Sequence, residues 1–287
     1  SGPRAGLVAD AGVIDVEQAS GGSLPSSVLE LLRTDPQLDR LASIIDVDPT
    51  HALDQVRLHT PIGRPGKILA AAGNYQEHVD EGGGTKVDPT RRTPRVFIKP
   101  SSSLIGPDDP VVLPSISHEV DWEMELAVVI GRGGRDIHVG SALDHVAGYT
   151  IMNDVSARSM DWGVIDRETH AWDGFFDWLM GKWLDTFAPT GPWIVTADEI
   201  DDPHDLRLTL DLNGERWQDA STGGMIFGID DLIAFISRGV VLEPGDIIAT
   251  GTPAGVGVAS GRFLQAGDLM VGEIEGIGRL ETPVVEA

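Results

Sequence analysis

Four acidic residues fall at every second position just ahead of an apolar run. They are Glu119, Asp121, Glu123 and Glu125, in the stretch HEVDWEMELAVVI (118–130). Because side chains alternate along a strand, a strand here places all four on one face, with neighbours roughly 7 Å apart at about 3.3 Å rise per residue. Two or three of these carboxylates could share one cation, whereas all four would span about 20 Å. Hard carboxylate oxygens suit Mg²⁺, Mn²⁺ or Ca²⁺. The alternative is a solvated strand edge.

A further acid, Asp154, ends a second strand-like run, GYTIMND (148–154), directly before a helix-like start. An acid at this place either caps the helix or binds a ligand, and capping is the commoner role. The E-x-E pattern of Glu123 and Glu125 elsewhere in the chain makes a third metal carboxylate credible.

The bulk composition excludes several classes of protein. The chain of 287 residues has 45 Asp and Glu against 21 Lys and Arg, a net charge of -24, and no cysteine. This charge argues against binding to nucleic acid or to anionic membranes, which require basic patches. The absence of cysteine excludes disulfides and thiolate chemistry. No apolar stretch approaches the roughly 18 residues of a membrane helix and no signal peptide is visible, so we expect a cytoplasmic protein.

Pro and Gly punctuation divides the chain into a small first part and a larger part. Two strand-like runs in 4–19 precede helical spacing over 26–45, which breaks near Pro36. The segment HTPIGRPGK (59–67) marks a boundary. We therefore expect a small N-terminal α+β domain over residues 1–64 and a catalytic domain over residues 65–287.

Short apolar or alternating runs bounded by turn residues dominate the second part and predict strands. Asn213-Gly214 is a strong two-residue hairpin signal. The clearest helices are predicted over 140–148 and 228–239. The result is a β-rich α+β fold rather than a regular βαβ alternation. The loop over 81–94 is long enough to be functional, and its Gly run could be the hinge of a lid.

An ordered set of motifs resembles the fumarylacetoacetate hydrolase family. The motifs are DWEMELAVVIG, NDVSARSMD, GKWLDTFAPTGPWIVT, NGERWQDASTGGMIFGIDDLIAFIS and IATGTPAGVG. They run in family order from about residue 67 to the C-terminus. The resemblance implies a mixed β-sandwich or β-roll catalytic domain, a homodimer, and Mg²⁺ or Mn²⁺ held by Glu123, Glu125 and Asp154. Glu119 and Asp121 are then left as supporting or solvated charges.

The same resemblance implies roles for further residues. GNYQEHVDE (73–81) matches the segment that bears the catalytic His and Glu of the family, here His78 and Glu81, and GKWLDTF contains the matching active-site lysine. The implied catalytic set is His78, Glu81 and Lys182. The implied substrate-binding set is Tyr75, Arg158, Gln218 and Thr252.

The implied reaction is hydrolysis of a C–C bond in a 1,3-diketo acid, such as an acylpyruvate. The metal would polarise the carbonyl group, His78 would deprotonate a water, Glu81 would orient the imidazole, and Lys182 would stabilise an oxyanion. The runner-up is a decarboxylase or isomerase of 2-oxo dicarboxylic acids on the same site. A non-catalytic metal-binding protein on this fold is disfavoured because the His, Glu and Lys are all present.

Two segments are left with alternative interpretations. The aromatic-rich stretch 162–183 packs in the core or a dimer, or forms an apolar wall that admits a bulky substrate. In the loop 81–94, Lys86, Arg91 and Arg92 contact a substrate carboxylate or are solvated.

Overall fold

The computed structural model describes residues 2–9 and 12–287. The first part of the chain contains the hairpin strands β1 (Gly6–Ala9) and β2 (Gly12–Asp15), then α1 (Val16–Ala19) and α2 (Val28–Thr34). The predicted turn between the two strands lies outside the described residues. A 3-10 segment (Asp39–Ile44) follows α2, so the helical region breaks near Pro36 as its sequence predicts.

Two sheets form the larger part of the molecule. The seven-stranded sheet has the order β4-β3-β14-β8-β9-β11-β5 and the five-stranded sheet has the order β13-β12-β15-β16-β6. The strands of the first are β3 (Ile68–Ala71), β4 (Val96–Lys99), β5 (Leu104–Ile105), β8 (Met124–Ile130), β9 (Val146–Asn153), β11 (Ala188–Thr196) and β14 (Ile247–Ala249). Those of the second are β6 (Val111–Leu113), β12 (Arg207–Leu212), β13 (Glu215–Ser221), β15 (Leu269–Ile274) and β16 (Gly278–Glu286). Both sheets mix parallel and antiparallel pairs.

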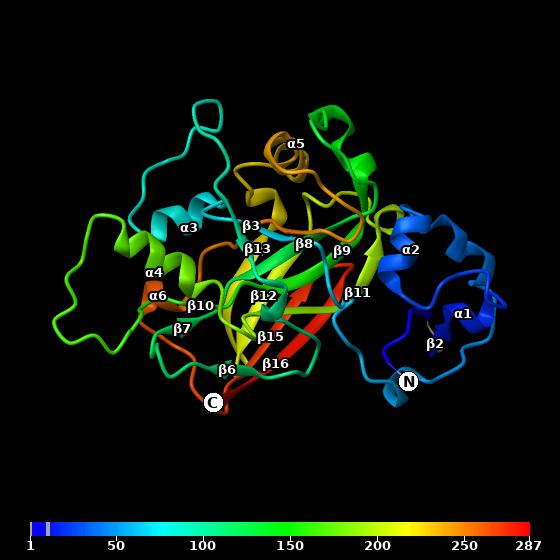
Figure 1. Ribbon diagram of the computed structural model, residues 1–287, viewed down its shortest axis with the longest axis horizontal. Helices are drawn as coiled ribbons and strands as arrows, with labels where there is room; N and C mark the ends of the chain where they lie inside the picture. The colour runs from blue at the N-terminus through cyan, green and yellow to red at the C-terminus, as the bar shows by residue number, and fades with distance from the viewer. Residues whose placement is uncertain (1, 10–11) are drawn as a thin grey trace.

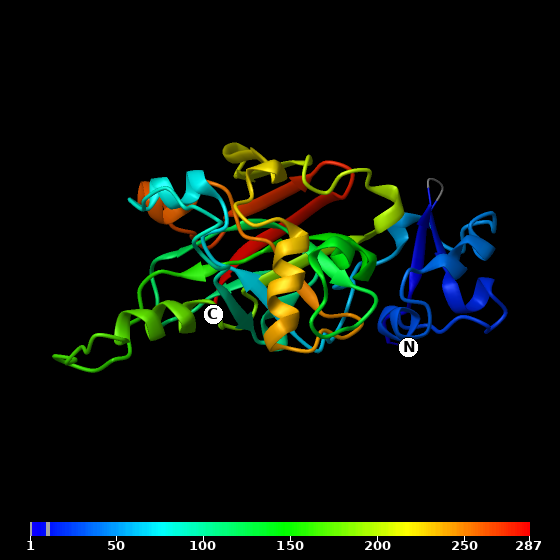
Figure 2. The same cartoon turned by 90° about the horizontal axis from the view of Figure 1, so that it is seen from above.

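The larger part of the molecule also contains α-helices. They are α3 (Gln76–Glu81), α4 (Asp173–Gly181), α5 (Ile229–Gly239) and α6 (Gly257–Ser260). A separate pair of short strands, β7 (Val120–Asp121) and β10 (Ser156–Ala157), lies beside α4 and α6. Figures 1 and 2 both show α3, α4 and α6 at the end of the molecule opposite the N-terminal part.

The hairpin predicted at Asn213-Gly214 is confirmed. The two residues connect β12 to β13, with φ angles of 54° and 82°. Positive φ at both central positions is what a tight type I′ turn requires.

One predicted helix is wrong. The stretch 140–148 forms a 3-10 segment only over Val139–His145, and Val146 already begins β9. Val146 and Gly148 pair with Ile130 and Val129 of β8. Strand pairing in the centre of the sheet therefore overrides the local helical spacing.

Apolar side chains pack against both faces of the seven-stranded sheet, and these two layers form the core. All seven residues of β8 are buried. Leu126 and Val128 belong to different apolar clusters from Ala127 and its neighbours, because alternate side chains point to opposite faces. Leu31 and Leu32 of the N-terminal part pack in the Ala127 cluster. Apolar contacts therefore cross the boundary predicted at residue 64, and the boundary itself stays a prediction.

These features confirm a β-rich α+β fold. Throughout the described ranges, the helices are too short or too polar to cross a membrane.

Candidate active site

The acidic residues meet where β8 begins and β9 ends. The two strands are antiparallel neighbours, and Met124 pairs with Asn153. This register brings Glu123 and Glu125 beside Asp154. One carboxylate oxygen from each lies within 4.8 Å of the others, and all three residues are buried. The structure thus gathers the three acids selected from the sequence, and their role as metal ligands stays a prediction.

The strand predicted over 118–130 is interrupted between β7 and β8. Trp122 lies at the break, and its buried ring packs edge-on against Trp217 with 5.2 Å between the centroids. Asp121 is fully buried, while Glu119 stays partly exposed. Burial raises the pKa of Asp121 to about 6, although the Arg158 charge opposes the shift.

Three cationic side chains surround the acids. Lys182 Nζ donates to Glu123 Oε2 at 2.8 Å and to Asp154 Oδ2 at 2.6 Å. Lys99 Nζ donates to Asp154 Oδ1 at 2.5 Å and to the main-chain oxygen of Lys182 at 2.6 Å. The Arg158 side chain donates to Glu123 Oε1 at 2.6 Å and to Asp121 Oδ1, on β7, at 2.7 Å. Burial lowers the pKa of Lys99, although Asp154 opposes the shift. The cations offset the repulsion that the acids would otherwise suffer.

The two glutamates of the E-x-E pattern occupy opposite electrostatic environments. Burial raises the pKa of Glu125 well above its usual range, and the charges of Asp154 and Glu123 add to the shift. Burial also opposes ionisation of Glu123, but the charges of Lys182 and Arg158 outweigh it and lower the pKa of Glu123. Lys182 also attracts Glu125, but among the described residues no cation donates a hydrogen bond to it, and burial and the two neighbouring acids outweigh the attraction.

One oxygen of Glu125 identifies what the cluster needs. Oε2 accepts a hydrogen bond from Gly251 N at 2.7 Å, whereas the buried Oε1 has no hydrogen-bond partner among the described residues. A buried acceptor without a donor is rare and requires an explanation. A divalent cation supplies one, because three converging carboxylates are hard oxygen ligands. The residues of the cluster therefore fit a divalent metal ion.

The loop after β14 holds several of these groups in place. Gly251 N binds Glu125, and Gly255 N donates to Glu81 Oε2 at 2.9 Å. Gly255 has φ of +101°, and a Cβ atom there would lie 2.0 Å from a main-chain oxygen of β13. Only glycine fits this position without displacing the loop. The loop after β14 therefore positions both Glu125 of β8 and Glu81 of α3.

Helix α3 presents the predicted His–Glu pair. His78 Nδ1 lies 2.7 Å from Glu81 Oε1, one helical turn away, and each side chain is about one fifth exposed. The Tyr75 hydroxyl is buried and has no hydrogen-bond partner among the described residues. Burial raises the pKa of Tyr75, and the Glu125 charge adds to this.

Gln218 and Thr252 are predicted to bind substrate, and their side chains hydrogen-bond to each other and to the main chain at the start of β8. Gln218 Nε2 donates to Thr252 Oγ1 at 2.8 Å, and Gln218 Oε1 accepts from Met124 N at 3.0 Å. Thr252 Oγ1 donates to the Met124 main-chain oxygen at 2.9 Å. These bonds fix the start of β8. Substrate contact by Gln218, Thr252, Tyr75 and Arg158 stays a prediction.

Sequence reasoning missed two residues, Lys99 and Asn74. Lys99 ends the apolar run RVFIK, and a lysine inside such a run was the available signal. The Asn74 side chain donates to the main-chain oxygens of Phe227 and Thr250 at 3.0 and 2.8 Å, and accepts from Phe227 N at 3.0 Å. Asn74 thereby ties the start of α3 to the β14 loop.

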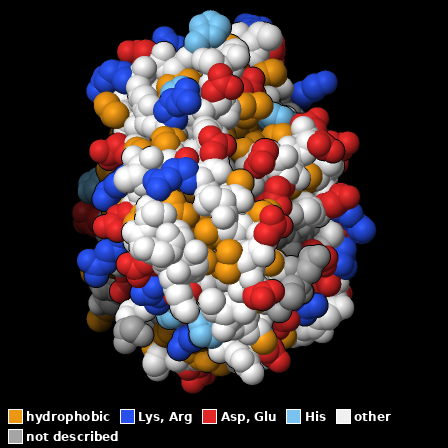
Figure 3. Space-filling model, turned by 90° about the vertical axis from the view of Figure 1, so that its right-hand side faces the viewer, with side chains coloured by type: hydrophobic (Ala, Val, Ile, Leu, Met, Phe, Trp, Pro, Cys, Tyr) orange, Lys and Arg blue, Asp and Glu red, His pale blue; other side chains and the backbone are white. Residues whose placement is uncertain are grey.

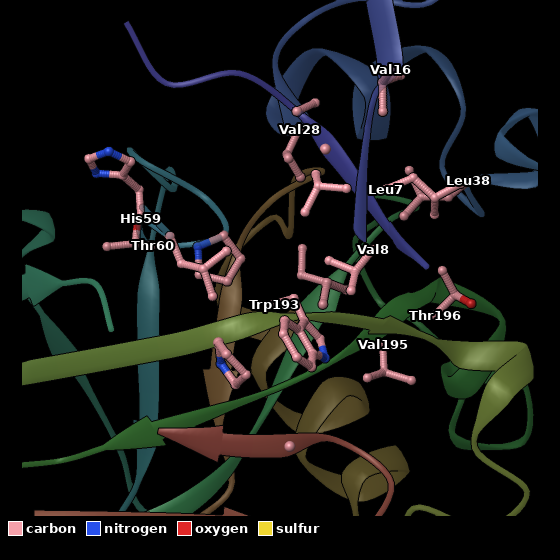
Figure 4. A pocket seen from close by; sticks show the side chains of 18 of the residues that line it. Leu7, Val8, Val16, Val28, Leu38, His59, Thr60, Trp193, Val195 and Thr196 are labelled. Carbon is pink, nitrogen blue, oxygen red and sulfur yellow. The ribbon is translucent and has the colours of Figure 1, made fainter. Parts of the chain in front are cut away.

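A wide cleft lies elsewhere, against the N-terminal part. It encloses about 2580 Å³ and is lined by β1, the end of β11 and the segment 56–64. Figure 4 shows Leu7, Val8 and Trp193 facing it. The face of the molecule that carries this part mixes acidic, basic and apolar side chains (Figure 3). No member of the buried acid cluster lines this cleft in the described ranges, so its size alone does not make it the active site.

Known proteins are similar to this chain in sequence and in fold. The family model described as fumarylacetoacetate (FAA) hydrolase C-terminal matches residues 67–285. A protein named mitochondrial oxaloacetate tautomerase from Xenopus laevis is 41% identical over 289 residues, 99% of this chain and 86% of that protein. A solved maleylpyruvate hydrolase from Sphingobium sp. SYK-6 has a TM-score of 0.79 at 32% identity, covering 100% of this chain and 98% of its own. A fumarylacetoacetate hydrolase from Exiguobacterium antarcticum has a TM-score of 0.80 at 36% identity, with 99% and 95% covered.

This chain belongs to the fumarylacetoacetate hydrolase family, and it is an enzyme of that family. The predicted family and its β-rich fold are confirmed. The relatives carry names of different reactions, so membership leaves the reaction to be argued from the site.

Proposed function

We propose that this chain is a Mg²⁺- or Mn²⁺-dependent enzyme of 2-oxo acids, and that it interconverts the keto and enol forms of an oxaloacetate-type dicarboxylic acid. The observation that carries the proposal is the buried Glu123–Glu125–Asp154 cluster with its unpartnered Glu125 oxygen. The full-length similarity to a protein named oxaloacetate tautomerase supports this choice of reaction. It corresponds to the isomerase alternative predicted from the sequence.

A divalent ion held by Glu123, Glu125 and Asp154 would supply a Lewis acid that polarises the 2-oxo group of the substrate. The residues around this site would bind and orient the substrate and would move its protons. Lys182 and Arg158 bring positive charge beside the acids, which favours an anionic substrate. Because Glu81 contacts His78 Nδ1 at 2.7 Å, the pair favours the tautomer with its proton on Nδ1. His78 Nε2 is then left to take a proton from the carbon beside the keto group and to return one to the enol oxygen.

Oxaloacetate tests the tautomerase directly. Enol and keto forms are followed by ultraviolet absorbance and proton NMR, with Mn²⁺, with Mg²⁺ and after treatment with EDTA. We expect interconversion faster than in buffer with metal alone, and its loss on chelation. Full activity in metal-free protein would refute the metal role, and no acceleration with either ion would refute the tautomerase.

Hydrolysis of a 1,3-diketo acid such as an acylpyruvate is the second candidate. The observation in its favour is the braced His78–Glu81 pair, in which Gly255 N holds the second Glu81 oxygen. A histidine oriented by a carboxylate can deprotonate an attacking water. The similarity to a structure named maleylpyruvate hydrolase supports the same candidate.

Product identification separates the reactions. Incubation with acylpyruvates and oxaloacetate yields two acids if the enzyme is a hydrolase and CO₂ if it is a decarboxylase. A tautomerase gives neither product and only speeds the approach to the keto–enol equilibrium. The homodimer and the cytoplasmic location expected from the sequence stay predictions. Light scattering after size exclusion tests the first.

A further inference from the structure

The Lys182 ammonium lies between two kinds of partner. On one side it donates to Glu123 and Asp154. On the other, its Nζ lies 5.4 Å from the ring centroid of Phe97 and 5.8 Å from that of Trp178. The two rings pack edge-on against each other, with centroids 5.2 Å apart and an angle of 73°. Both distances fall within the range of cation–π attraction.

The local structure explains how these groups meet. Trp178 and Lys182 are four residues apart at the end of α4, which places them on one helix face. The last residue of α4, directly before the lysine, is Gly181, and a Cβ atom there would lie 2.1 Å from the main-chain oxygen of Ala157. This glycine allows the end of α4 to approach β10. Phe97 comes from β4, where it shares a strand face with Lys99.

The ammonium also competes with a metal ion for the same side chains. Lys182 donates to Glu123 Oε2 and Asp154 Oδ2, and both side chains belong to the candidate ligand set. An ion that takes these oxygens must displace the ammonium from them. Lys182 is only 2% exposed, and a buried cation without partners is strongly unfavourable.

We propose that Phe97 and Trp178 form an aromatic seat for the Lys182 ammonium, which allows the lysine to release Glu123 and Asp154 to a divalent cation while remaining beside the site. The inference rests on the divalent site of the proposed function. Phe97 and Trp178 are positioning residues, because they act through Lys182.

A double-mutant cycle tests the seat without substrate. Mn²⁺ affinity is measured by electron paramagnetic resonance on the full chain for the wild type, Trp178→Leu, Lys182→Met and the double variant. We expect Trp178→Leu to weaken Mn²⁺ binding roughly threefold to thirtyfold, the range of one cation–π interaction. Lys182→Met should bind Mn²⁺ at least as tightly as the wild type, because the competing ammonium is gone. In the Lys182→Met background, Trp178→Leu should then have no further effect.

Matched variants exclude a general packing effect. Trp172→Leu removes an aromatic side chain of the same segment that is 70% exposed, and it should leave Mn²⁺ affinity unchanged. Trp178→Phe retains a ring face and should restore most of the affinity lost in Trp178→Leu. Phe97→Leu provides the same test from the β4 side if Trp178→Leu does not fold, as judged by thermal melting.

The outcomes separate this inference from the proposed function. Equal weakening by Trp178→Leu in both backgrounds, no weakening, or tighter binding overturns the seat while leaving the metal site intact. Absence of Mn²⁺ binding in the wild type overturns both, and it is recognised before any variant is compared.

Discussion

Two groups of paired acids and bases in this protein differ in burial. At the start of β8, Glu123 is held by Lys182 and Arg158, and all three side chains are at most 12% exposed. On the β12–β13 hairpin, Arg207 binds Asp219 at 2.6 Å with side chains that are 62% and 43% exposed. The residue types and distances are alike, while the surrounding solvent differs.

The difference shows that burial, rather than residue type, creates the site. On the hairpin, water screens the charges, and such a pair contributes about 0–1 kcal/mol to stability. At β8, burial moves the pKa of Glu125 up, while nearby cations move that of Glu123 down. A buried, unequal set of carboxylates is where perturbed pKa values and metal binding are expected.

Glu123→Gln should have the largest effect on this contrast. The change leaves the buried Lys182 and Arg158 short of an anion, and breaking a buried pair typically costs about 3–5 kcal/mol. We expect a loss near the lower end of that range, because Asp154 and Asp121 still bind the two cations. Urea unfolding measures it, and Mn²⁺ titration should show that metal binding is lost. Unchanged stability would mean that the buried network behaves like the exposed one.

His78→Ala should separate chemistry from metal binding. Removal of a general acid–base group should slow turnover by roughly 10²–10⁴-fold. Mn²⁺ affinity should remain, because His78 is not among the three clustered acids. Steady-state kinetics and Mn²⁺ titration on the same preparation provide the measurement. A near-wild-type rate would remove His78 from the mechanism.

Glu125→Gln should abolish metal binding yet leave the metal-free protein as stable as the wild type, or more so. Its ionised form is disfavoured in the fold, because burial and the charges of Asp154 and Glu123 raise the pKa of the Glu125 carboxyl above its usual 4.5. The native state therefore binds this proton more strongly than the unfolded state does, and stability falls as the pH rises from 4.5 towards the folded pKa. Thermal melting of metal-free protein across this window should show a shallower fall for Glu125→Gln. An identical pH profile in both proteins would contradict the prediction.

Asp219→Asn on the hairpin should have the smallest effect. The pair with Arg207 is exposed to water, so we expect a change of less than about 1 kcal/mol in unfolding free energy. Mn²⁺ affinity and turnover should not change. Because the variant removes one negative charge, as Glu123→Gln does, it also serves as the control for net charge. A larger loss would show that exposed pairs on this sheet are not screened.

Much of the fold could be predicted from local patterns. Short apolar runs identified β3, β8, β9 and β14, and Asn213-Gly214 identified a hairpin. The errors arose where contacts with residues distant in the sequence decide the secondary structure. Val146 begins β9 because it pairs with Ile130. The strand predicted over 118–130 breaks at Trp122, whose ring is buried against Trp217.

The candidate site divides in the same way. The E-x-E spacing of Glu123 and Glu125, and the place of Asp154 at the end of a strand-like run, indicated candidate metal ligands from the sequence alone. Lys99 was not, because nothing local to RVFIK indicates that Asp154, 55 residues away, accepts its hydrogen bond. Asn74 was missed for the same reason, since its partner Phe227 is 153 residues away.

The sequence by itself determined which ligand chemistry is possible. A chain without cysteine and with acids at alternating positions can offer hard oxygen ligands along a strand, because side-chain alternation is a local property of the backbone. Tertiary structure decided which of those acids are buried, which cations accompany them, and that Glu125 Oε1 is left without a partner. Desolvation and charge–charge interactions act through space, so they depend on residues that only folding brings together, such as Lys182 and Glu123 across 59 positions of the chain.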